Sequence, residues 1–360
     1  MKKEFIDPWG SELPADYQKL IKSFGLERFK LEDFPKPNKI MRRGVVFAGR
    51  GLDIITKAIK EKKKFYCLTG MMPSSDKIHL GNKLVIDNVK YFQDMGAETY
   101  VLIADLEAAA TRGVSIEEAR KRAMDYFIPA YIALGLNPGK TKFYFQSQNK
   151  SVVALAFELS NKATLNEYRA IYGQPTPSRI MGSVLQVADI LYPQLKEEIP
   201  GVIPVGIDQD PHIRLARDIA KRAKDKRNFF LPSSIYHKYT PALDGSLKMS
   251  KSTGNFIELP DTDENIKTKI MKALTGGRKT LEEQKRLGGQ PEKDMVYELF
   301  KQHLIESDKE FEKRWQDNKA GKLTSKEDKE YAVELMIKFM HDFKKKFEKA
   351  KKTKIQFLEE

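Results

Sequence analysis

The run Phe65-Tyr66-Cys67-Leu68-Thr69 is short and apolar between polar flanks, and Gly70 and a polar loop over 73–82 follow it. An apolar run without alternation predicts a strand that is buried on both faces, as in a parallel sheet. We expect Gly70 to end this strand and a helix over about 81–95 to follow the loop. This strand–loop–helix unit decides the fold, because the alternation of strand and helix continues to about residue 222.

Similar apolar runs at 99–104, 141–145 and 201–205 predict three further buried strands. Strands that alternate with helices predict an α/β fold with a doubly wound parallel sheet of the Rossmann type. Functional sites in such sheets lie beyond the carboxyl ends of the strands, so residues 68–79, Glu107 and 206–210 are expected to converge. The helices between the strands are expected over 115–134, 151–195 with an interruption at 173–177, and 210–222.

The regions on either side of this alternation have a different character. Residues 1–60 combine a short helical stretch with a connection containing Pro35 and Pro37, and are expected to form an N-terminal extension. Residues 61–256 are expected to form the catalytic domain. From residue 263 onwards the pattern is helical, rich in lysine and without a convincing strand, so 257–360 is predicted to be an all-helical domain.

Composition limits the class of protein. The 360 residues carry a net charge of +14, from 64 basic and 50 acidic residues. This balance fits a polyanionic partner, and it equally fits a lysine-rich surface of the thermophile type. Cys67 is the only cysteine, which excludes internal disulfides and a cysteine-based zinc site. No apolar run approaches the roughly 20 residues of a membrane helix, and the start lacks a signal-peptide pattern, so we expect a cytoplasmic protein without membrane contact.

Two loops carry residues suited to a polyphosphate. Leu247-Lys248-Met249-Ser250-Lys251-Ser252-Thr253-Gly254-Asn255 places two lysines among small residues that favour a mobile loop. Pro73-Ser74-Ser75-Asp76-Lys77-Ile78-His79-Leu80-Gly81-Asn82 precedes a helix start, which can receive a phosphate. A lysine loop alone is more often solvated surface, and a lone His-x-Gly is more often structural. The presence of both loops in one chain favours a functional interpretation of each.

Together the loops resemble the two signature sequences of class I aminoacyl-tRNA synthetases, the His-x-Gly-His motif and the Lys-Met-Ser-Lys-Ser loop. The second matches letter for letter, whereas Asn82 replaces the last histidine of the first. The run Gly206-Ile207-Asp208-Gln209-Asp210-Pro211-His212 is similar to one shared by tryptophanyl- and tyrosyl-tRNA synthetases, in the form typical of the tryptophan enzymes.

The resemblance to archaeal tryptophanyl-tRNA synthetases covers nearly the whole chain. Asp7-Pro8-Trp9 and Arg42-Arg43-Gly44 resemble their N-terminal extension, and Thr275-Gly276-Gly277-Arg278 resembles the start of their anticodon-binding domain. The resemblance implies that 257–360 binds the anticodon, with Arg278 in contact with tRNA. It also implies a homodimer whose interface lies in an insert at about 108–195.

The implied activity is that of a tryptophan–tRNA ligase, which forms tryptophanyl-adenylate from L-tryptophan and ATP with Mg²⁺ and transfers it to the 3′ end of tRNA(Trp). Such an enzyme mainly positions reactants and stabilises charge. The implied catalytic residues are His79, Lys248 and Lys251, and no protein residue is expected to bind a metal. The implied ATP-binding residues are Pro73, Ser74, His79, Gly81, Asn82, Gly206, Asp208, Lys248, Met249, Ser250 and Lys251.

The choice of amino acid rests on two positions. Tyrosine enzymes hold the phenol with a tyrosine at the end of the first strand and an aspartate on a later helix; here Leu68 and Asp189 stand at these places. Leucine cannot bind a phenol hydroxyl, and a carboxylate, which only accepts, suits the indole N–H. Eukaryotic tryptophan enzymes use a tyrosine and a glutamine instead, so this chain departs from them. The implied tryptophan-binding residues are Leu68, Glu107, Gln186, Asp189 and Gln209, of which Gln209 would bind the polar head.

Three alternatives remain open. One is a tyrosine–tRNA ligase, against which Leu68 and Glu107 speak. Another is an adenylyltransferase outside translation, against which the lysine loop and the helical C-terminal region speak. The third is a synthetase-derived binding protein without catalysis, which the replacement at Asn82 keeps open. Amino-acid-dependent pyrophosphate exchange, tried with tryptophan and tyrosine, separates them.

Replacing Lys248 or Lys251 by alanine should lower the rate of adenylate formation by orders of magnitude and change tryptophan affinity little. The reason is that both ammonium groups are expected to stabilise the charge that moves onto pyrophosphate in the transition state. Single-turnover adenylate formation measures this rate. Unchanged rates in both variants would contradict the assignment of these lysines as catalytic residues.

Overall fold

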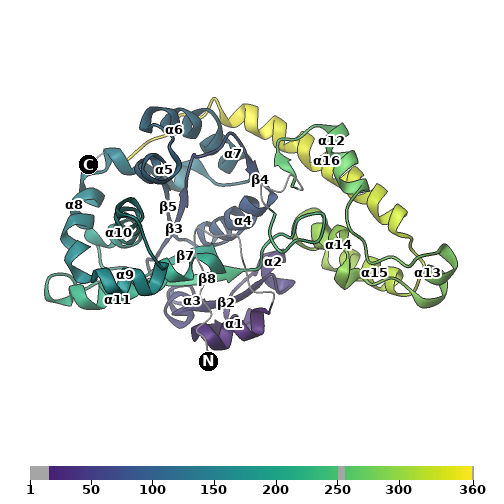
Figure 1. Ribbon diagram of the computed structural model, residues 1–360, viewed down its shortest axis with the longest axis horizontal. Helices are drawn as coiled ribbons and strands as arrows, with labels where there is room; N and C mark the ends of the chain where they lie inside the picture. Colours follow the sequence, from purple (N-terminus) through teal and green to yellow (C-terminus); the bar gives the residue numbers. More distant parts are fainter. Residues whose placement is uncertain (1–15, 250–255, 359–360) are drawn as a thin grey trace.

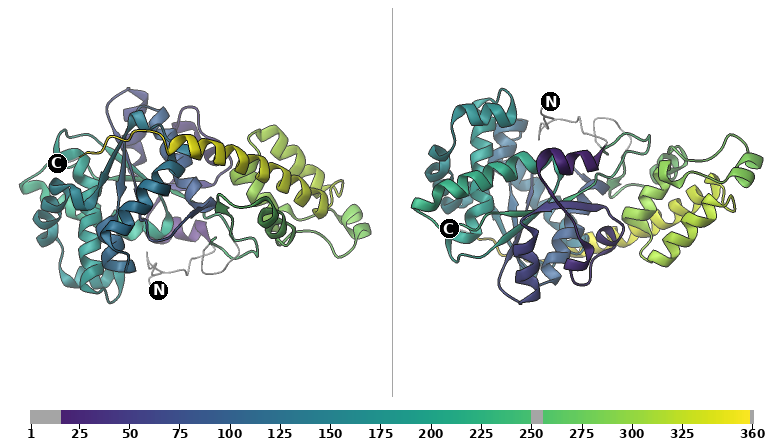
Figure 2. Two further views of the ribbon diagram at one scale, coloured as in Figure 1. Left: turned by 90° about the horizontal axis from the view of Figure 1, so that it is seen from above. Right: turned by 90° about the horizontal axis from the view of Figure 1, so that it is seen from below.

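The computed structural model describes residues 16–249 and 256–358. The run Asp7-Pro8-Trp9 and the loop residues Ser250 and Lys251 lie outside these ranges. A lobe built on a central sheet carries helices on both faces, and a second, helical lobe extends to one side of it (Figures 1 and 2). None of the described helices is long and apolar enough to cross a membrane.

Within the described residues, a seven-stranded sheet has the order β1-β2-β8-β7-β3-β5-β6. Strands β8, β7, β3, β5 and β6 run parallel, whereas β1 and β2 add an antiparallel edge. The predicted doubly wound α/β fold is thus confirmed. The strands are β1 (Glu27–Arg28), β2 (Val46–Arg50), β3 (Tyr66–Met71), β5 (Glu98–Ile103), β6 (Thr141–Phe145), β7 (Gly201–Gly206) and β8 (Ser233–His237), with β4 (Ile78–His79) and β9 (Glu258–Leu259) forming a separate pair.

The strand order reverses between β3 and β7. From β3 the chain continues through β5 to β6 on one side, and later through β7 to β8 on the other. Tyr66 pairs with Gly201 across this junction, and a Cβ at Gly201 would lie 1.9 Å from Cζ of the Tyr66 ring, so only glycine fits. A crevice outside the carboxyl ends of these two strands is the expected ligand site of such a sheet.

The expectation that Gly70 ends the first strand is wrong. Strand β3 continues to Met71, which pairs with Ile103 of β5. A Cβ at Gly70 would lie 3.3 Å from Cγ of Leu102, so the glycine gives room to the neighbouring side chain rather than a turn to its own strand.

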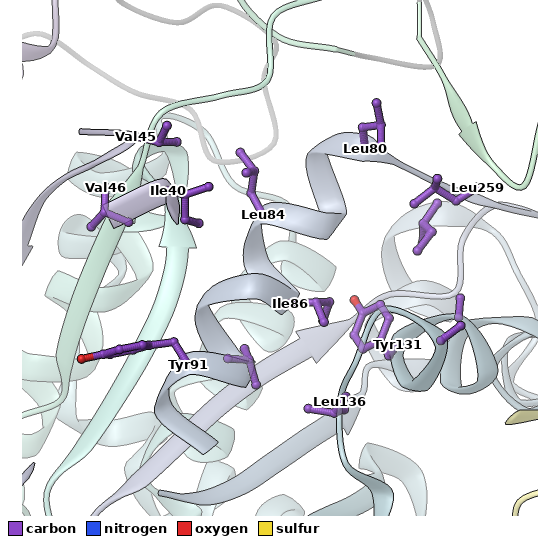
Figure 3. Close-up of a cluster of buried hydrophobic side chains, with 14 of the residues drawn as sticks. Ile40, Val45, Val46, Leu80, Leu84, Ile86, Tyr91, Tyr131, Leu136 and Leu259 are labelled. Carbon is purple, nitrogen blue, oxygen red and sulfur yellow. The ribbon is translucent and has the colours of Figure 1, made fainter. Parts of the chain in front are cut away.

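Helices cover both faces of the sheet. On one face α3, α4 and α7 build one core cluster, and on the other α8 to α11 build a second. Leu80, Leu84 and Ile86 of α4 point into the first cluster, and Leu259 of β9 lies near the start of this helix (Figure 3). The helices are α1 (Tyr17–Phe24), α2 (Lys39–Arg42), α3 (Leu52–Lys60), α4 (Leu80–Asp94), α5 (Asp105–Arg112), α6 (Ile116–Arg122), α7 (Ile128–Ala133), α8 (Lys150–Leu159), α9 (Leu165–Tyr172), α10 (Pro177–Leu191), α11 (Asp210–Arg222), α12 (Asp263–Met271), α13 (Leu281–Leu287), α14 (Met295–Leu299), α15 (Asp308–Lys319) and α16 (Ser325–Ala350).

The helical lobe stays in contact with the sheet lobe at both of its ends. Strand β9 pairs with β4, so the segment just after the lysine loop lies against His79. Helix α16 runs from the helical lobe back to α7 (Figure 1). Beyond it, the Leu358 N–H donates to the Phe143 carbonyl at 2.8 Å, and the Phe357 ring stacks on Phe145 beside the edge strand β6. The tail therefore ties the helical lobe to the edge of the sheet.

Candidate active site

A cavity of about 460 Å³ opens where β3 and β7 end. It brings together most residues that the sequence selected: Leu68, His79, Gly81, Asn82, Glu107, Gln186, Gly206, Asp208, Gln209, Lys248 and Met249. Pro73, Ser74 and Asp189 are not among the lining residues, and Arg278 lies in the helical lobe. One part of the wall is apolar, with Leu102, Ala104 and Ile203 beside Leu68.

His79 forms the cap of helix α4. Its Nδ1 accepts the backbone N–H of Gly81 at 3.0 Å, so the ring proton of the neutral histidine is on Nε2. A Cβ at Gly81 would lie 2.8 Å from Cε1 of this ring. The glycine of the His-x-Gly motif is therefore required by the close approach of the histidine side chain to the helix start.

Asn82 completes this cap in the reverse direction. Its side-chain oxygen accepts the backbone N–H of His79 at 3.1 Å, which makes a reciprocal capping box. The amide nitrogen of Asn82 carries two N–H donors that this contact does not use. The residue that replaces the expected histidine thus supports the helix start with its oxygen and faces the cavity.

Lys248 and Asp208 meet on another part of the cavity wall. Nζ of Lys248 lies 2.8 Å from a carboxylate oxygen of Asp208 and 5.1 Å from the centre of the Tyr239 ring. The Asp208 N–H donates to the Tyr239 hydroxyl at 2.9 Å. Gly206 leaves room for this arrangement, since a Cβ there would lie 2.7 Å from the Asp208 carboxylate.

Glu107 and Gln186 form a polar pair on the cavity wall. Gln186 Nε2 donates to the Glu107 carboxylate at 2.7 Å. Glu107 is almost fully buried, and this burial raises the pKa of its carboxyl to about 7. The hydrogen bond from Gln186 and the charge of Arg112 act in the opposite direction and favour the ionised form.

Asp189 lies behind the cavity wall on α10. Its two carboxylate oxygens accept hydrogen bonds from the Tyr144 hydroxyl at 2.9 Å and from Gln146 Nε2 at 2.7 Å. Complete burial raises the pKa of this carboxyl to about 8, although both hydrogen bonds favour the ionised form. Gln146 also accepts the Glu107 N–H at 3.4 Å, so one amide connects the two buried carboxyls.

Sequence reasoning missed four residues of this site: Tyr144 and Gln146 in the buried network, and His212 and Tyr239 on the cavity wall. His212 ends the 206–212 run, but no role was predicted for it. Its Nδ1 lies 2.8 Å from the Tyr172 hydroxyl, and burial lowers its pKa to about 4, so it is neutral. Gln146 follows the predicted third strand directly, and this position was the signal that could have marked it as a site residue.

Arg278 has a structural contact in the helical lobe. Its Nε donates to the Gly288 carbonyl at 2.8 Å, which links the two ends of α13. At Gly288 a Cβ would lie 1.8 Å from the Lys319 carbonyl oxygen, so backbones pack directly on each other here. Lys279, Lys285 and Arg286 remain exposed around α13.

Among the residues that the structure describes, no group of three or more His, Cys, Asp or Glu side chains is arranged to hold a metal ion.

A family described as tRNA synthetases class I (W and Y) matches residues 60–341. The tryptophan–tRNA ligase of Methanocaldococcus jannaschii is 41% identical to this chain, over 100% of this chain and 99% of that protein. The enzyme of the same name from Hyperthermus butylicus is 40% identical, over 98% of each chain.

Solved structures agree with these sequence relatives. The tryptophanyl-tRNA synthetase of Aeropyrum pernix matches with a TM-score of 0.88 at 41% identity, covering 96% of this chain and 97% of that one. The Plasmodium falciparum enzyme matches with a TM-score of 0.85 at 27% identity, covering 93% and 94%. A Rossmann-type sheet with a cavity at its switch point fits this class of enzyme. The chain belongs to the class I tRNA synthetases for tryptophan and tyrosine, and within them to the tryptophan–tRNA ligases.

Proposed function

We propose that the cavity is the place where L-tryptophan reacts with ATP, and that tryptophanyl-adenylate is then passed from it to the 3′ end of tRNA(Trp). The observation that carries this proposal is the pairing of two unlike ends in one cavity. One end has the capped start of α4 and Lys248, and the other has an apolar wall with the Glu107–Gln186 pair.

The reaction joins a carboxylate oxygen of tryptophan to the α-phosphorus of ATP, and the bond from that phosphorus to the pyrophosphate leaving group breaks. His79 Nε2–H and the Asn82 amide donate to phosphate oxygens, next to the positive end of the α4 dipole. Asp208 holds the ribose hydroxyls, and its ion pair with Lys248 must open for this to occur. Lys248 and Lys251 then follow the negative charge onto pyrophosphate, with Pro73, Ser74, Met249 and Ser250 completing the ATP site.

We propose that Mg²⁺ enters with ATP, bound to its phosphate oxygens. Phosphate oxygens together with water and few protein carboxylates are the usual surroundings of this ion in ATP-dependent enzymes.

The indole is proposed to lie against the apolar wall, with its N–H directed to Asp189. Each oxygen of an ionised carboxylate has two lone pairs, so an oxygen that already binds Tyr144 or Gln146 can accept one bond more. Ile190, the neighbour of Asp189 in sequence, lines the cavity, whereas Asp189 is fully buried, so the proposal requires the wall to move when the indole binds. Leu68 provides no partner for the hydroxyl of tyrosine.

Pyrophosphate exchange should depend on tryptophan and not on tyrosine or phenylalanine. Asp189→Asn should raise the tryptophan requirement strongly and affect ATP little, because a buried acceptor is lost at a cost of about 1–3 kcal/mol. A tryptophan analogue with sulfur in place of the indole nitrogen should be a poor substrate of the native enzyme, and that gap should shrink in the variant. If native enzyme activates the sulfur analogue as well as tryptophan, Asp189 is not the indole acceptor.

Tryptophan affinity should fall as the pH is lowered from 8 to 6, because the ammonium group needs the ionised form of Glu107. The pKa of this carboxyl is raised to about 7 in the free enzyme, so binding at lower pH must first remove a proton. Well below that pKa the loss approaches about tenfold per pH unit. Calorimetric titration at several pH values measures it. Glu107→Gln should bind more weakly and with a smaller pH dependence, and the part that remains is due to Asp189, whose pKa is raised to about 8. A native affinity that is flat over the range would contradict the assignment.

We propose that the helical lobe binds tRNA through the exposed basic residues around α13. Phosphate contacts make such binding fall steeply with salt. Reversing the charge of both Lys285 and Arg286 should reduce the salt dependence and weaken aminoacylation, while pyrophosphate exchange stays normal. Lys60→Glu, a charge reversal at another exposed residue, on α3 of the other lobe, is the control. Unaltered charging of tRNA by the double variant would refute the proposal, as would equal loss with the control.

A homodimer is proposed through α8, α9 and α10. These helices expose Phe157 at 69%, Leu165 at 51% and Met181 at 59%, and apolar exposure on this scale within one region is typical of an interface. Sedimentation equilibrium tests this, and a monomer at micromolar concentration would contradict it. The cytoplasm is the proposed location, since it holds both ATP and tRNA.

A further inference from the structure

A π-helical turn, Phe300–Leu304, connects α14 to the segment before α15 and brings the helical lobe to the rim of the active site. Gln302 and His303 on this turn are 1% and 3% exposed. Both contact Thr240, which follows β8 and lines the cavity. Turns of this kind are uncommon and occur frequently at functional sites, so the contacts of these two side chains are of interest.

The hydrogen bonds at Thr240 show which group is the donor in each of its contacts with Gln302 and His303. The Thr240 hydroxyl donates its one proton to the Gln302 side-chain oxygen at 2.8 Å. The contact of 3.1 Å between the same hydroxyl oxygen and His303 Nε2 must then be donated by the histidine. Burial, together with Lys83, Lys39 and His79 nearby, lowers the pKa of His303 well below its usual value, so the ring is neutral with its proton on Nε2.

The backbone of Thr240 in turn holds the start of the lysine loop. Its carbonyl oxygen accepts the N–H of Met249 at 2.8 Å. Met249 follows Lys248 directly, and Nζ of Lys248 lies 2.8 Å from Asp208. A continuous series of contacts therefore joins the π-helical turn to the lysine that the reaction uses.

The N-terminal extension holds the turn from its other side. Arg43 is nearly buried and donates to the carbonyls of Phe300, Lys301 and Ile305 at 3.3, 3.0 and 2.7 Å. Lys39 Nζ donates to the carbonyl of His303 at 2.9 Å. The Phe300 carbonyl also accepts the Ile305 N–H at 3.2 Å. The side chains of Arg43 and Lys39 thus supply donors to backbone carbonyls at the end of a helix, where such groups often lack an intrahelical partner.

We propose that Gln302 and His303 are positioning residues, which set the location of Lys248 through Thr240 and thereby couple the helical lobe to adenylate formation. The proposal rests on the role of Lys248 in the proposed function. Neither side chain needs to touch a substrate, and a displacement on the scale of one ångström at a charged group near the reacting phosphates can cost up to about a hundredfold in rate.

His303→Leu should slow single-turnover adenylate formation by about tenfold or more, with tryptophan affinity unchanged. His303→Gln should restore most of the rate, because a glutamine amide can place an N–H donor where Nε2 stands. Thermal unfolding checks that the variants fold. Thr240→Val removes the shared hydroxyl and keeps the carbonyl, so it gives an independent reading if the leucine variant does not fold.

Combination with Lys248→Ala separates positioning from a general structural effect. If His303 acts through Lys248, His303→Leu should have no further effect on the rate once the lysine is absent. The matched control is Arg42→Ala, which removes an ion pair to Asp308 at the same interface but no contact to Thr240, and should leave the rate unchanged. Equal fractional losses with and without Lys248, or a normal rate in both His303→Leu and Thr240→Val, would overturn the proposal. A normal rate in Lys248→Ala alone would instead refute the role of the lysine.

Discussion

The packing of the Tyr66 ring against Gly201 holds the active site together. It allows β3 and β7 to lie side by side with their carboxyl ends at one edge of the sheet. The strand of this sheet that follows β3 is added on one side of this pair and the strand that follows β7 on the other. The buried Tyr66 hydroxyl also donates to the Ile190 carbonyl at 2.7 Å and accepts from Gln194. One side chain thus fixes the strand junction and helix α10, which carries Gln186 and Asp189.

A second constraint is electrostatic. Two carboxyls, Glu107 and Asp189, are buried in an apolar wall, and burial raises the pKa of each. A buried charge is tolerated only with hydrogen-bond partners, which Gln186, Tyr144 and Gln146 supply. In the proposed function, the ammonium group of tryptophan pairs with Glu107 and its indole N–H with Asp189, so one ligand would offset part of the cost of burying both carboxyls.

Much of this could be predicted from the sequence. Apolar runs without alternation identified four of the five parallel strands and missed β8. The rule that sites lie at strand ends grouped Leu68, His79 and Asp208 correctly in one cavity. The strand end at Gly70 was mispredicted, because pairing with Ile103 rather than local composition decides it. The reciprocal cap that Asn82 makes with His79 depends on backbone geometry that a motif does not express.

Other features have no local signal. The burial of Asp189 behind the wall depends on Tyr144 and Gln146, which are more than forty positions away along the chain. The contact of His303 with Thr240 joins segments 63 positions apart. Such pairs follow from how lobes pack, and a helical pattern alone predicts neither the π-helical turn nor the return of Phe357 to the sheet edge.

The most direct test of the central claim is a crystal structure with a non-hydrolysable analogue of tryptophanyl-adenylate. The account predicts the indole beside Leu68 with its nitrogen directed to Asp189, the phosphate within hydrogen-bond distance of His79 Nε2, and the ribose on Asp208 with Lys248 released from it. An analogue bound elsewhere, or bound in the cavity with the Lys248–Asp208 pair intact and the phosphate away from His79, would contradict the account.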